Sequence, residues 1–185
     1  MPIYAVGAKT PRIHPTAFVA PTATVVGDVT IHAHASIWYG AVVRGDTSYV
    51  VIGRGANIQD GAVVHSRAGN PALIGEEVSV AHGCVVHGAT IGARALIANG
   101  AIVLDGAIVG EGALIAAGAV VPPGAEIPAG TLALGIPAQT KGPLAGTPAE
   151  EWVRTGPERY AMLTALHRAG LRELQRPDVP SPDEP

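Results

Sequence analysis

The sequence predicts an all-β solenoid, built as a parallel β-helix and followed by a C-terminal α-helix. Three observations predict it. A branched aliphatic residue, Ile or Val, recurs nineteen times, almost always every six residues, between Ile13 and Ile127. The residue four positions after each of these aliphatic residues is usually small, and it is alanine thirteen times. Hydrophobic residues make up 48% of the chain but aromatic residues only 4%, so small aliphatic side chains must form the core.

Each six-residue unit supplies a short strand and a turn, and three units close one triangular coil. Stacked coils share backbone hydrogen bonds and bury one continuous core. A period of six does not match the 3.6-residue period of an α-helix. The period does not give the handedness; known folds built from hexapeptide repeats are left-handed, and a left-handed β-helix is therefore expected over residues 1–135. The aliphatic positions are Ile13, Val19, Val25, Ile31, Ile37, Val43, Ile52, Ile58, Val64, Ile74, Val80, Val86, Ile91, Ile97, Val103, Val109, Ile115, Val121 and Ile127.

The small positions are counted forward from the aliphatic ones, and each is expected to lie where the chain bends. Besides the alanines, the count places Val29, Val78, Thr47, Thr90, Thr131 and Cys84 there. The alanines are Ala17, Ala23, Ala35, Ala41, Ala56, Ala62, Ala68, Ala95, Ala101, Ala107, Ala113, Ala119 and Ala125.

The repeat stops after Ile127, and residues 136–176 are expected to form a connector and a helix that packs on the β-helix. Thr147-Pro148-Ala149-Glu150 has the pattern of a capping box, and Thr155-Gly156-Pro157-Glu158 repeats it. The predicted helix runs from about Pro157 to Gln175. Its apolar stripe comprises Met162, Leu163, Leu166, Leu171 and Leu174. The Pro-rich segment 177–185 is expected to be disordered.

Composition excludes several classes of function. The net charge is −3 and no run of Lys or Arg occurs, so no nucleic-acid partner is expected. No stretch of eighteen apolar residues occurs, so no membrane span is expected. The N-terminus lacks the pattern of a secretory signal, and Cys84 is the one cysteine, which rules out an intrachain disulfide. These features predict a cytoplasmic protein.

The six-residue step fails at three places. It lengthens to nine between Val43 and Ile52 and to ten between Val64 and Ile74, and it shortens to five between Val86 and Ile91. Extra residues in a solenoid form loops that leave one side of it. The longer insert covers roughly residues 66–73, and His65, His82 and His87 flank or follow it. These three histidines are the candidate metal ligands.

Counting coils assigns the candidates to faces. Val43, Val64 and Val86 fall on one face, so Arg44, His65 and His87 should point outward from it, stacked about 4.8 Å apart. Asp60 and His82 each follow an aliphatic residue of another face and should also stack. His82 therefore belongs to a different face, near a corner, and cannot easily join the other two. His82 of a neighbouring subunit could, which predicts an intersubunit site in a homotrimer.

Three neutral imidazoles suit Zn²⁺, with Fe²⁺ and Co²⁺ as alternatives. Three protein ligands leave a position for water, as catalytic sites do, and the ion makes hydroxide available at neutral pH. Asn57, Gln59 and Asp60, just before His65, are candidates for the polar shell that orients ligands and hydroxide.

Several further polar residues are expected to play no part in a metal site. His14, His32, His34 and His167 lie away from the breaks and are interpreted as surface or partly buried histidines. Cys84 lies between two candidate ligands, but it holds the small inward position of its repeat. Arg44 and Asp46 are either solvated charges or an ion pair across the trimer interface.

Residues 37–122 resemble the γ-class carbonic anhydrase family, and most of all its shorter bacterial branch of carnitine-operon, phenylacetate-degradation and ferripyochelin-binding-like proteins. The matching stretches are WYGAVVRGD (38–46), IGRGANIQDGAVVH (52–65), IGEEVSVAHGCVVHG (74–88) and GAIVLDGAIVGEGALIAAGAVV (100–121). The resemblance implies zinc or iron held by His65 and His87 of one subunit and His82 of the next. It also implies that Arg44 and Asp46 pair across the interface.

The same resemblance implies a polar shell of Asn57, Gln59 and Asp60, and Tyr160 is similar to a family tyrosine near the site. One departure concerns proton transfer. The best-studied type carries a glutamate directly after its Arg-x-Asp motif and another on a long acidic loop. Here Thr47 stands at the first position, and the insert 66–71 has no acidic residue. CO₂ hydration needs proton export, so the departure predicts slow or absent turnover.

The leading functional hypothesis is a lyase that reversibly hydrates CO₂ to bicarbonate with metal-generated hydroxide at a trimer interface. Hydrolysis of a thioester at the same metal site is the alternative within enzymes. A hexapeptide acyltransferase would need one histidine as a base and a coenzyme A site between subunits. A non-catalytic scaffold with a vestigial site is the remaining alternative.

Overall fold

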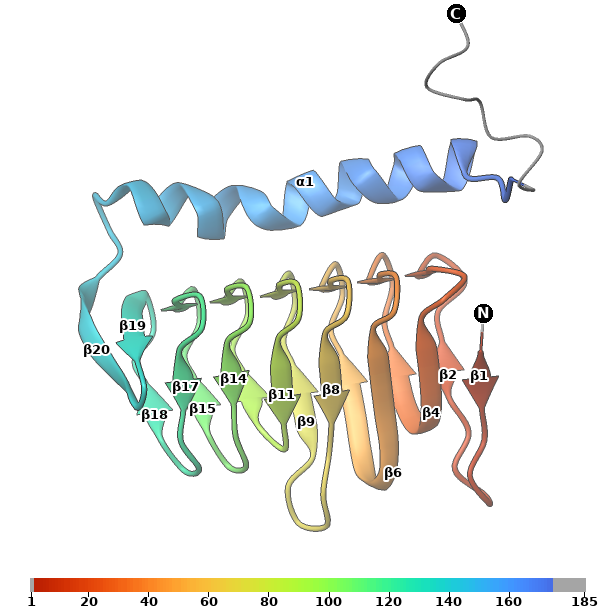
Figure 1. Ribbon diagram of the computed structural model, residues 1–185, viewed down its shortest axis with the longest axis horizontal. Helices are drawn as coiled ribbons and strands as arrows, with labels where there is room; N and C mark the ends of the chain where they lie inside the picture. Colours follow the sequence, from red (N-terminus) through yellow and green to blue (C-terminus); the bar gives the residue numbers. More distant parts are fainter. Residues whose placement is uncertain (1, 175–185) are drawn as a thin grey trace, which may run out of the picture.

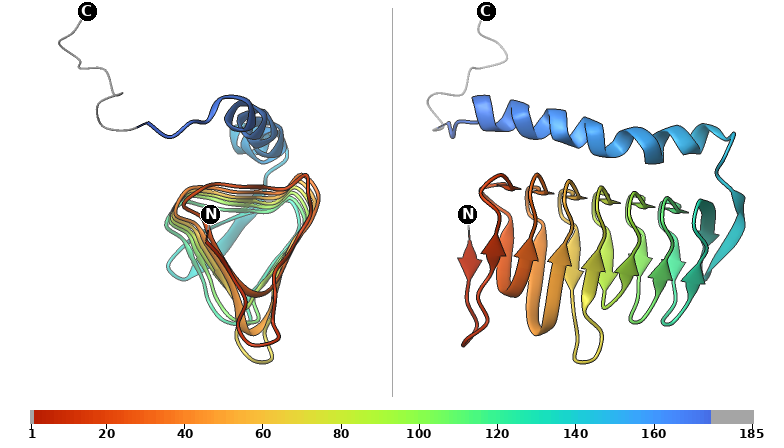
Figure 2. Two further views of the ribbon diagram at one scale, coloured as in Figure 1. Left: turned by 90° about the vertical axis from the view of Figure 1, so that its right-hand side faces the viewer. Right: turned by 180° about the vertical axis from the view of Figure 1, so that it is seen from behind.

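The computed structural model describes residues 2–174, and it confirms the all-β solenoid: a left-handed parallel β-helix of stacked triangular coils with one α-helix alongside (Figures 1 and 2). The strands are β1 (Ile3–Tyr4), β2 (Arg12–Ile13), β3 (Phe18–Val19), β4 (Thr24–Ile31), β5 (Ser36–Ile37), β6 (Val42–Ile52), β7 (Asn57–Ile58), β8 (Val63–His65), β9 (Ala72–Ile74), β10 (Ser79–Val80), β11 (Val85–His87), β12 (Thr90–Ile91), β13 (Leu96–Ile97), β14 (Ile102–Val103), β15 (Ile108–Val109), β16 (Leu114–Ile115), β17 (Val120–Val121), β18 (Glu126–Ile127), β19 (Thr131–Gly135) and β20 (Ala138–Pro143).

The coils form three faces. The helix face, which α1 covers, stacks β3, β5, β7, β10, β13, β16 and β19. The histidine face stacks β8, β11, β14 and β17, and the rear face stacks β9, β12, β15 and β18. The long strands β4 and β6 pass from the histidine face to the rear face without a break, which joins these two faces into one 12-stranded sheet.

Three rows of turns form the corners of the triangle seen end-on in Figure 2. The glycine corner, between the helix and histidine faces, has left-handed glycines in successive coils, at Gly40, Gly61, Gly83, Gly100 and Gly118. The loop corner, between the histidine and rear faces, carries the inserts. The charged corner, between the rear and helix faces, has His34, Gly55, Glu77, Arg94, Gly112 and Gly130 in the equivalent positions.

The core consists of the predicted aliphatic series, and from Val25 to Ile127 all of these side chains are buried. The predicted small positions are wrong at the three irregular steps, where Thr47, Ala68 and Thr90 are exposed. Val50, Ala72 and Ala89 are buried in their place, two residues before Ile52, Ile74 and Ile91. The buried small residue lies two positions before the next aliphatic residue. Counting four positions forward from the previous one therefore misses it wherever the step differs from six.

The C-terminal part closes one end of the solenoid and then returns along it. β19 and β20 pair antiparallel, a hairpin that the six-residue pattern did not predict. The helix α1 (Pro148–Gly170) runs back over the helix face, as Figure 1 shows. The predicted segment 177–185 lies outside the described residues.

The predicted start of the helix near Pro157 is wrong, because Pro157 lies inside α1. Thr147 is the N-cap and Pro148 occupies the first turn, where the missing N–H of proline costs nothing. The capping box is not formed: the Thr147 hydroxyl donates to the Leu144 carbonyl, and the Glu150 carboxylate accepts from the N–H of Gly146. The first of the two cap-like patterns therefore begins the helix.

The predicted apolar stripe of α1 is wrong in part as a packing face. Leu163 packs on the core as predicted, whereas Met162 and Leu166 are 74% and 65% exposed. Tyr160, outside the predicted stripe, also packs on the core, and its ring lies 5.2 Å from that of Trp38. His167 contacts Trp38 and its Nδ1 lies 2.8 Å from the Tyr39 hydroxyl. Aromatic contacts, which hydrophobic counting did not include, therefore orient the helix.

Across residues 2–174, no helix combines the length and the apolar character that a membrane crossing requires.

Candidate metal centre

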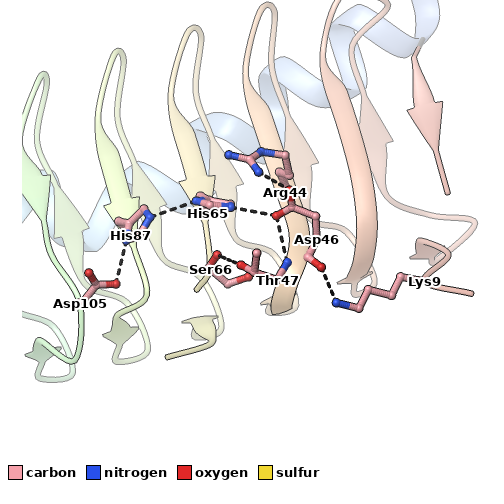
Figure 3. A network of polar contacts seen from close by, with 8 residues as sticks. All are labelled: Lys9, Arg44, Asp46, Thr47, His65, Ser66, His87 and Asp105. Atoms are coloured by element: carbon pink, nitrogen blue, oxygen red, sulfur yellow. Dashed lines mark hydrogen bonds and ion pairs between the residues drawn. The ribbon is translucent and has the colours of Figure 1, made fainter. Parts of the chain in front are cut away.

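Two of the three candidate ligands meet at the end of the histidine face. His65 ends β8 and His87 ends β11, and the two residues are register partners in adjacent coils, as Arg44 is with His65. The predicted outward stack is therefore confirmed. Nδ1 of His65 lies 3.0 Å from Nε2 of His87, and both side chains are partly buried (Figure 3).

A carboxylate contacts the remaining nitrogen of each ring. Nε2 of His65 lies 3.0 Å from Asp46 Oδ1, and Nδ1 of His87 lies 2.8 Å from Asp105 Oδ1. Asp46, His65, His87 and Asp105 thus form one chain of polar contacts across the coils, which Figure 3 shows. An ionised carboxylate only accepts hydrogen bonds, so each ring donates its proton to its own aspartate.

This arrangement leaves two lone pairs facing each other. When His65 donates through Nε2 and His87 through Nδ1, the two facing nitrogens, 3.0 Å apart, carry no proton in the neutral rings. Two such nitrogens repel unless a proton or a cation lies between or beside them. Two imidazole ligands on a tetrahedral zinc are roughly 3.3 Å apart for Zn–N of about 2.0–2.1 Å. The donor set and its spacing therefore fit a divalent metal ion.

Asp46 and Asp105, the two aspartates of this series of polar contacts, each have an arginine partner. Arg44 pairs with Asp46, and Arg67 Nη1 lies 3.3 Å from Asp105 Oδ2. Burial alone would raise the pKa of Asp46, but hydrogen bonds from His65, Arg44 and its own loop outweigh it and lower that pKa to about 2. Asp46 is therefore a carboxylate near neutral pH. Arg44 and Asp46 pair within one chain here, and their pairing across an interface stays a prediction.

Asp105 was not among the residues predicted from the sequence. Its position is set by Gly88, since a Cβ on this left-handed glycine would collide with Asp105 Oδ1. Strand register aligns His87 with the residue before Asp105, which reaches back from the turn that follows β14. Its position one coil after His87, eighteen residues on, is the signal that could have found it.

The third candidate, His82, lies at the glycine corner in the turn between β10 and β11. Its Nδ1 is 2.9 Å from Asp60 Oδ2, which confirms that these two residues stack in adjacent coils. Its Nε2 is 3.3 Å from the Tyr160 hydroxyl of α1. Burial, and then the charge of Asp60, raise the pKa of Tyr160 to about 12, so the phenol stays protonated.

His82 and the His65–His87 pair lie at opposite ends of the histidine face. His82 lies in the turn before β11 (Val85–His87), and β11 carries the chain from that corner to His87 at the other end of the face. Within residues 2–174, no group of three His, Cys, Asp or Glu side chains is placed to hold one ion. One chain therefore brings together two of the three predicted ligands and keeps the third apart.

The three candidates share a feature that sets them apart from other histidines. Each has one ring nitrogen against its own aspartate: Asp46, Asp60 and Asp105. Metal-binding histidines are commonly oriented by such carboxylates. In contrast, His14 contacts Thr16 and His167 contacts Tyr39.

Asn57 and Gln59 lie buried beneath α1, on the side of the triangle that leads to His82. Gln59 Nε2 donates to Asn57 Oδ1 at 2.9 Å, and Asn57 Nδ2 donates to Ser79 Oγ at 2.9 Å. Asp60 follows directly and contacts His82. Asp60 therefore joins this segment to His82, and none of the three residues contacts the His65–His87 pair of the same chain.

Cys84 is buried, and its Sγ lies 3.4 Å from the carbonyl oxygen of Ile97 and 3.0 Å from that of Ala98. Burial raises the pKa of its thiol to about 11. The thiol points into the solenoid and does not take part in the site.

Comparison with known proteins identifies the family. A family model for bacterial transferase hexapeptides, six repeats, matches residues 88–123. A carbonic anhydrase from Geobacillus kaustophilus is 47% identical over 137 residues, 74% of this chain and 75% of that protein. Gamma carbonic anhydrase 2, a mitochondrial protein of Arabidopsis thaliana, is 44% identical over 98 residues, 50% of this chain. The chain matches only 35% of the length of this plant relative.

Solved structures agree on the fold. A hexapeptide transferase family protein from Anaplasma phagocytophilum has a TM-score of 0.84 and 36% identity, covering 92% of this chain and 98% of that one. A Bacillus cereus protein described as an acetyltransferase has a TM-score of 0.87 and 36% identity, covering 90% and 96%. With the histidine geometry and the Geobacillus relative, these matches show that the chain belongs to the γ-class carbonic anhydrase family of hexapeptide-repeat proteins.

Proposed function

We propose that the protein is a metal-dependent lyase that reversibly hydrates CO₂ to bicarbonate at sites shared between the protomers of a homotrimer. The observation that carries the proposal is the convergence of two imidazole nitrogens, 3.0 Å apart, with the other nitrogen of each ring against an aspartate. Zn²⁺ is the proposed ion, and Fe²⁺ or Co²⁺ would suit the same nitrogen donors.

The third ligand in this proposal is His82 of the partner subunit. His82 is exposed at the glycine corner, and Asp60 contacts its Nδ1. This leaves Nε2, which lies 3.3 Å from the Tyr160 hydroxyl of the same chain, as the nitrogen for a metal. The His65–His87 pair lies at the opposite end of the histidine face. A cyclic arrangement in which the glycine corner of one triangle meets the loop corner of the next therefore completes three equal sites.

The exposed side of α1 supports such an assembly. At 3.6 residues per turn, Trp152, Met162 and Leu166 share the flank of the helix that faces the glycine corner. All three are largely exposed. A second protomer at the glycine corner would cover this apolar flank, which removes a surface that is costly to leave in water.

An ion on three imidazoles supplies an open position for water and lowers the pKa of that water toward neutrality. The residues of the chain prepare the site for this chemistry. Asp46, Asp60 and Asp105 orient the rings and keep the coordinating nitrogens free of protons. Asn57 and Gln59 form a rigid buried amide pair beside His82, where they can position CO₂. The protonated Tyr160 donates a hydrogen bond next to His82.

Proton export is the weak step in this proposal. Thr47 Oγ1 donates to the Ser66 carbonyl at 2.7 Å, so this side chain ties β6 to the segment after β8 and offers no base. Asp46 and Asp105 are held by arginines and by the histidines themselves. The proposal therefore includes a turnover limited by proton transfer to buffer.

The test is CO₂ hydration measured by stopped flow on anaerobically purified protein of known metal content. The proposal expects about one ion per protomer and activity that follows metal content, both lost in His65→Ala and in His82→Ala. His32→Ala, at an exposed histidine outside these contacts, is the matched control. If the parent protein hydrates CO₂ no faster than His65→Ala, the hydration proposal fails. Metal binding without hydration would leave thioester hydrolysis as the reaction to assay, whereas an acyltransferase would need no metal.

A further inference from the structure

The charged corner departs from the rule that glycine occupies the left-handed position of a turn. Within residues 2–174, three residues other than glycine have positive φ: His34 at 60°, Glu77 at 55° and Arg94 at 56°. All three lie on the charged corner. Backbone hydrogen bonds connect their turns to those of Gly55, Gly112 and Gly130, which hold the same position in other coils.

A side chain in this conformation strains the backbone, because its Cβ approaches the neighbouring carbonyl. Glycine would remove the strain, and the same row uses it in other coils. Residues kept in strained conformations concentrate at functional sites. The fold alone therefore does not account for the charged side chains at this corner.

These side chains meet in one groove. A cavity of about 260 Å³ lies between the charged corner and α1, and His34, Glu77 and Arg94 all line it. Arg54 adds a guanidinium from the β-helix, and Arg154 adds another from α1. The three strained positions thus face a common space and not separate patches of solvent.

The three arginines retain binding capacity. Arg54 and Arg94 each contact a carboxylate of the next coil, Glu76 and Glu111, through a single nitrogen, Nη2. Arg154 is 4.0 Å from Glu151, also through Nη2. A guanidinium has five N–H donors in a planar fork, so each keeps donors that suit an oxyanion. Glu76, Glu111 and Glu151 do not line the cavity.

We propose that this groove binds a small oxyanion that carries phosphate or carboxylate groups. Arg54, Arg94 and Arg154 bind its charged oxygens. The acidic lining residues, Glu77 and Glu158, accept hydrogen bonds from its hydroxyl groups. Ser36, buried at the base, accepts from Trp38 Nε1 at 3.0 Å and can donate its own proton into the groove.

The groove also reaches the candidate metal centre through one residue. Tyr160 lines the cavity, and its hydroxyl is 3.3 Å from His82 Nε2. An anion in the groove therefore lies next to the helix residue that contacts His82. The binding itself does not depend on a metal or on CO₂ hydration, and it can be measured on protein without metal.

Calorimetric titration with inorganic phosphate and with citrate, at ionic strength matched with NaCl, tests the proposal. Saturable binding of both probes supports a general oxyanion site, and binding of one assigns phosphate or carboxylate as the recognised group. Arg94→Gly is the decisive variant, because it installs the residue that this row uses at Gly112. We expect its affinity to fall at least about tenfold, as for loss of a charge-assisted contact. Its Tm without ligand should be unchanged or higher.

Two controls sharpen the result. Arg12→Ala removes an exposed arginine that pairs with Asp28 outside the groove, and it should bind the probe as the parent does. Glu111→Gln frees Arg94 from its partner and should strengthen binding. The proposal is overturned if neither probe binds beyond the NaCl control or if Arg94→Gly keeps its affinity. A lower Tm in Arg94→Gly would also overturn it, since Arg94 would then serve the fold.

Discussion

Nδ1 of His65 lies 3.0 Å from Nε2 of His87 in the next coil, while the opposite nitrogen of each ring contacts an aspartate. The parallel β-helix produces this geometry directly, because residues of adjacent coils stand in register one strand spacing apart. A solenoid stacks side chains along a face very accurately, but it cannot bring opposite ends of a face together. In the proposed site, His82 therefore comes from a second protomer.

Mixing two inactive variants tests this shared site. His65→Ala and His82→Ala should each lose hydration activity, since each removes a ligand from every site of a homotrimer. In a mixed trimer of either composition, one interface joins an intact His65 to an intact His82. Random assembly of equal amounts should therefore restore about a quarter of the parental sites. Co-expression followed by stopped-flow assay and metal analysis measures it.

A second mixture is the matched control for this recovery. Mixing His65→Ala with His87→Ala should restore nothing, because both substitutions damage the same side of the interface. Equal recovery in the two mixtures, or none in either, would contradict a site shared between protomers.

Asp105 should control metal affinity without controlling the fold. Its carboxylate fixes His87 through Nδ1 at 2.8 Å, so Asp105→Asn lets the ring change orientation or tautomer. Loss of such an orienting carboxylate typically weakens metal binding by about 10–100-fold. Competition with a chromophoric chelator measures the affinity. Glu76→Gln, which removes an exposed carboxylate that pairs with Arg54 at the charged corner, should leave it unchanged.

The β-helix could be predicted because its core depends on one local rule, repeated nineteen times. Ile58, for example, is inward because of its own sequence position, whatever lies elsewhere. The helix α1 could be predicted only in part. Its start depends on which of two similar cap patterns, at Thr147 or Thr155, the connector can reach, and its packing face depends on ring contacts with Trp38.

The candidate site could likewise be predicted only in part. Counting coils was enough to stack His65 on His87, because register follows the repeat. Asp105 was missed because it reaches His87 from a turn, one residue out of register, where the five-residue step after Val86 shifts the phase. The strained corner at His34, Glu77 and Arg94 was equally hidden, since φ angles are not visible in a pattern of hydrophobic residues.

Cys84 provides a pH-dependent test of the core. Burial raises its thiol pKa to about 11 in the folded protein, above the ordinary pKa of 9.0 expected for an unfolded chain. The stability that comes from keeping this thiol neutral is complete below pH 9.0 and is lost as pH rises toward about 11. Urea unfolding at several pH values should show this loss in the parent and not in Cys84→Ala. If the free energy of unfolding depends on pH equally in the parent and in Cys84→Ala, burial does not raise the pKa of this thiol.

Thr47→Glu should speed CO₂ hydration if proton export limits the parent enzyme. Residue 47 follows Asp46, whose Oδ1 contacts His65, so a glutamate there would place a mobile base beside the candidate centre. Positioned acid–base groups contribute about 100-fold or more when proton transfer limits the rate. The parent should depend strongly on buffer concentration, and the variant much less. Thr47→Gln, which also loses the bond to the Ser66 carbonyl but carries no base, separates proton transfer from loop movement. A kcat that is independent of buffer in the parent would show that another step limits turnover.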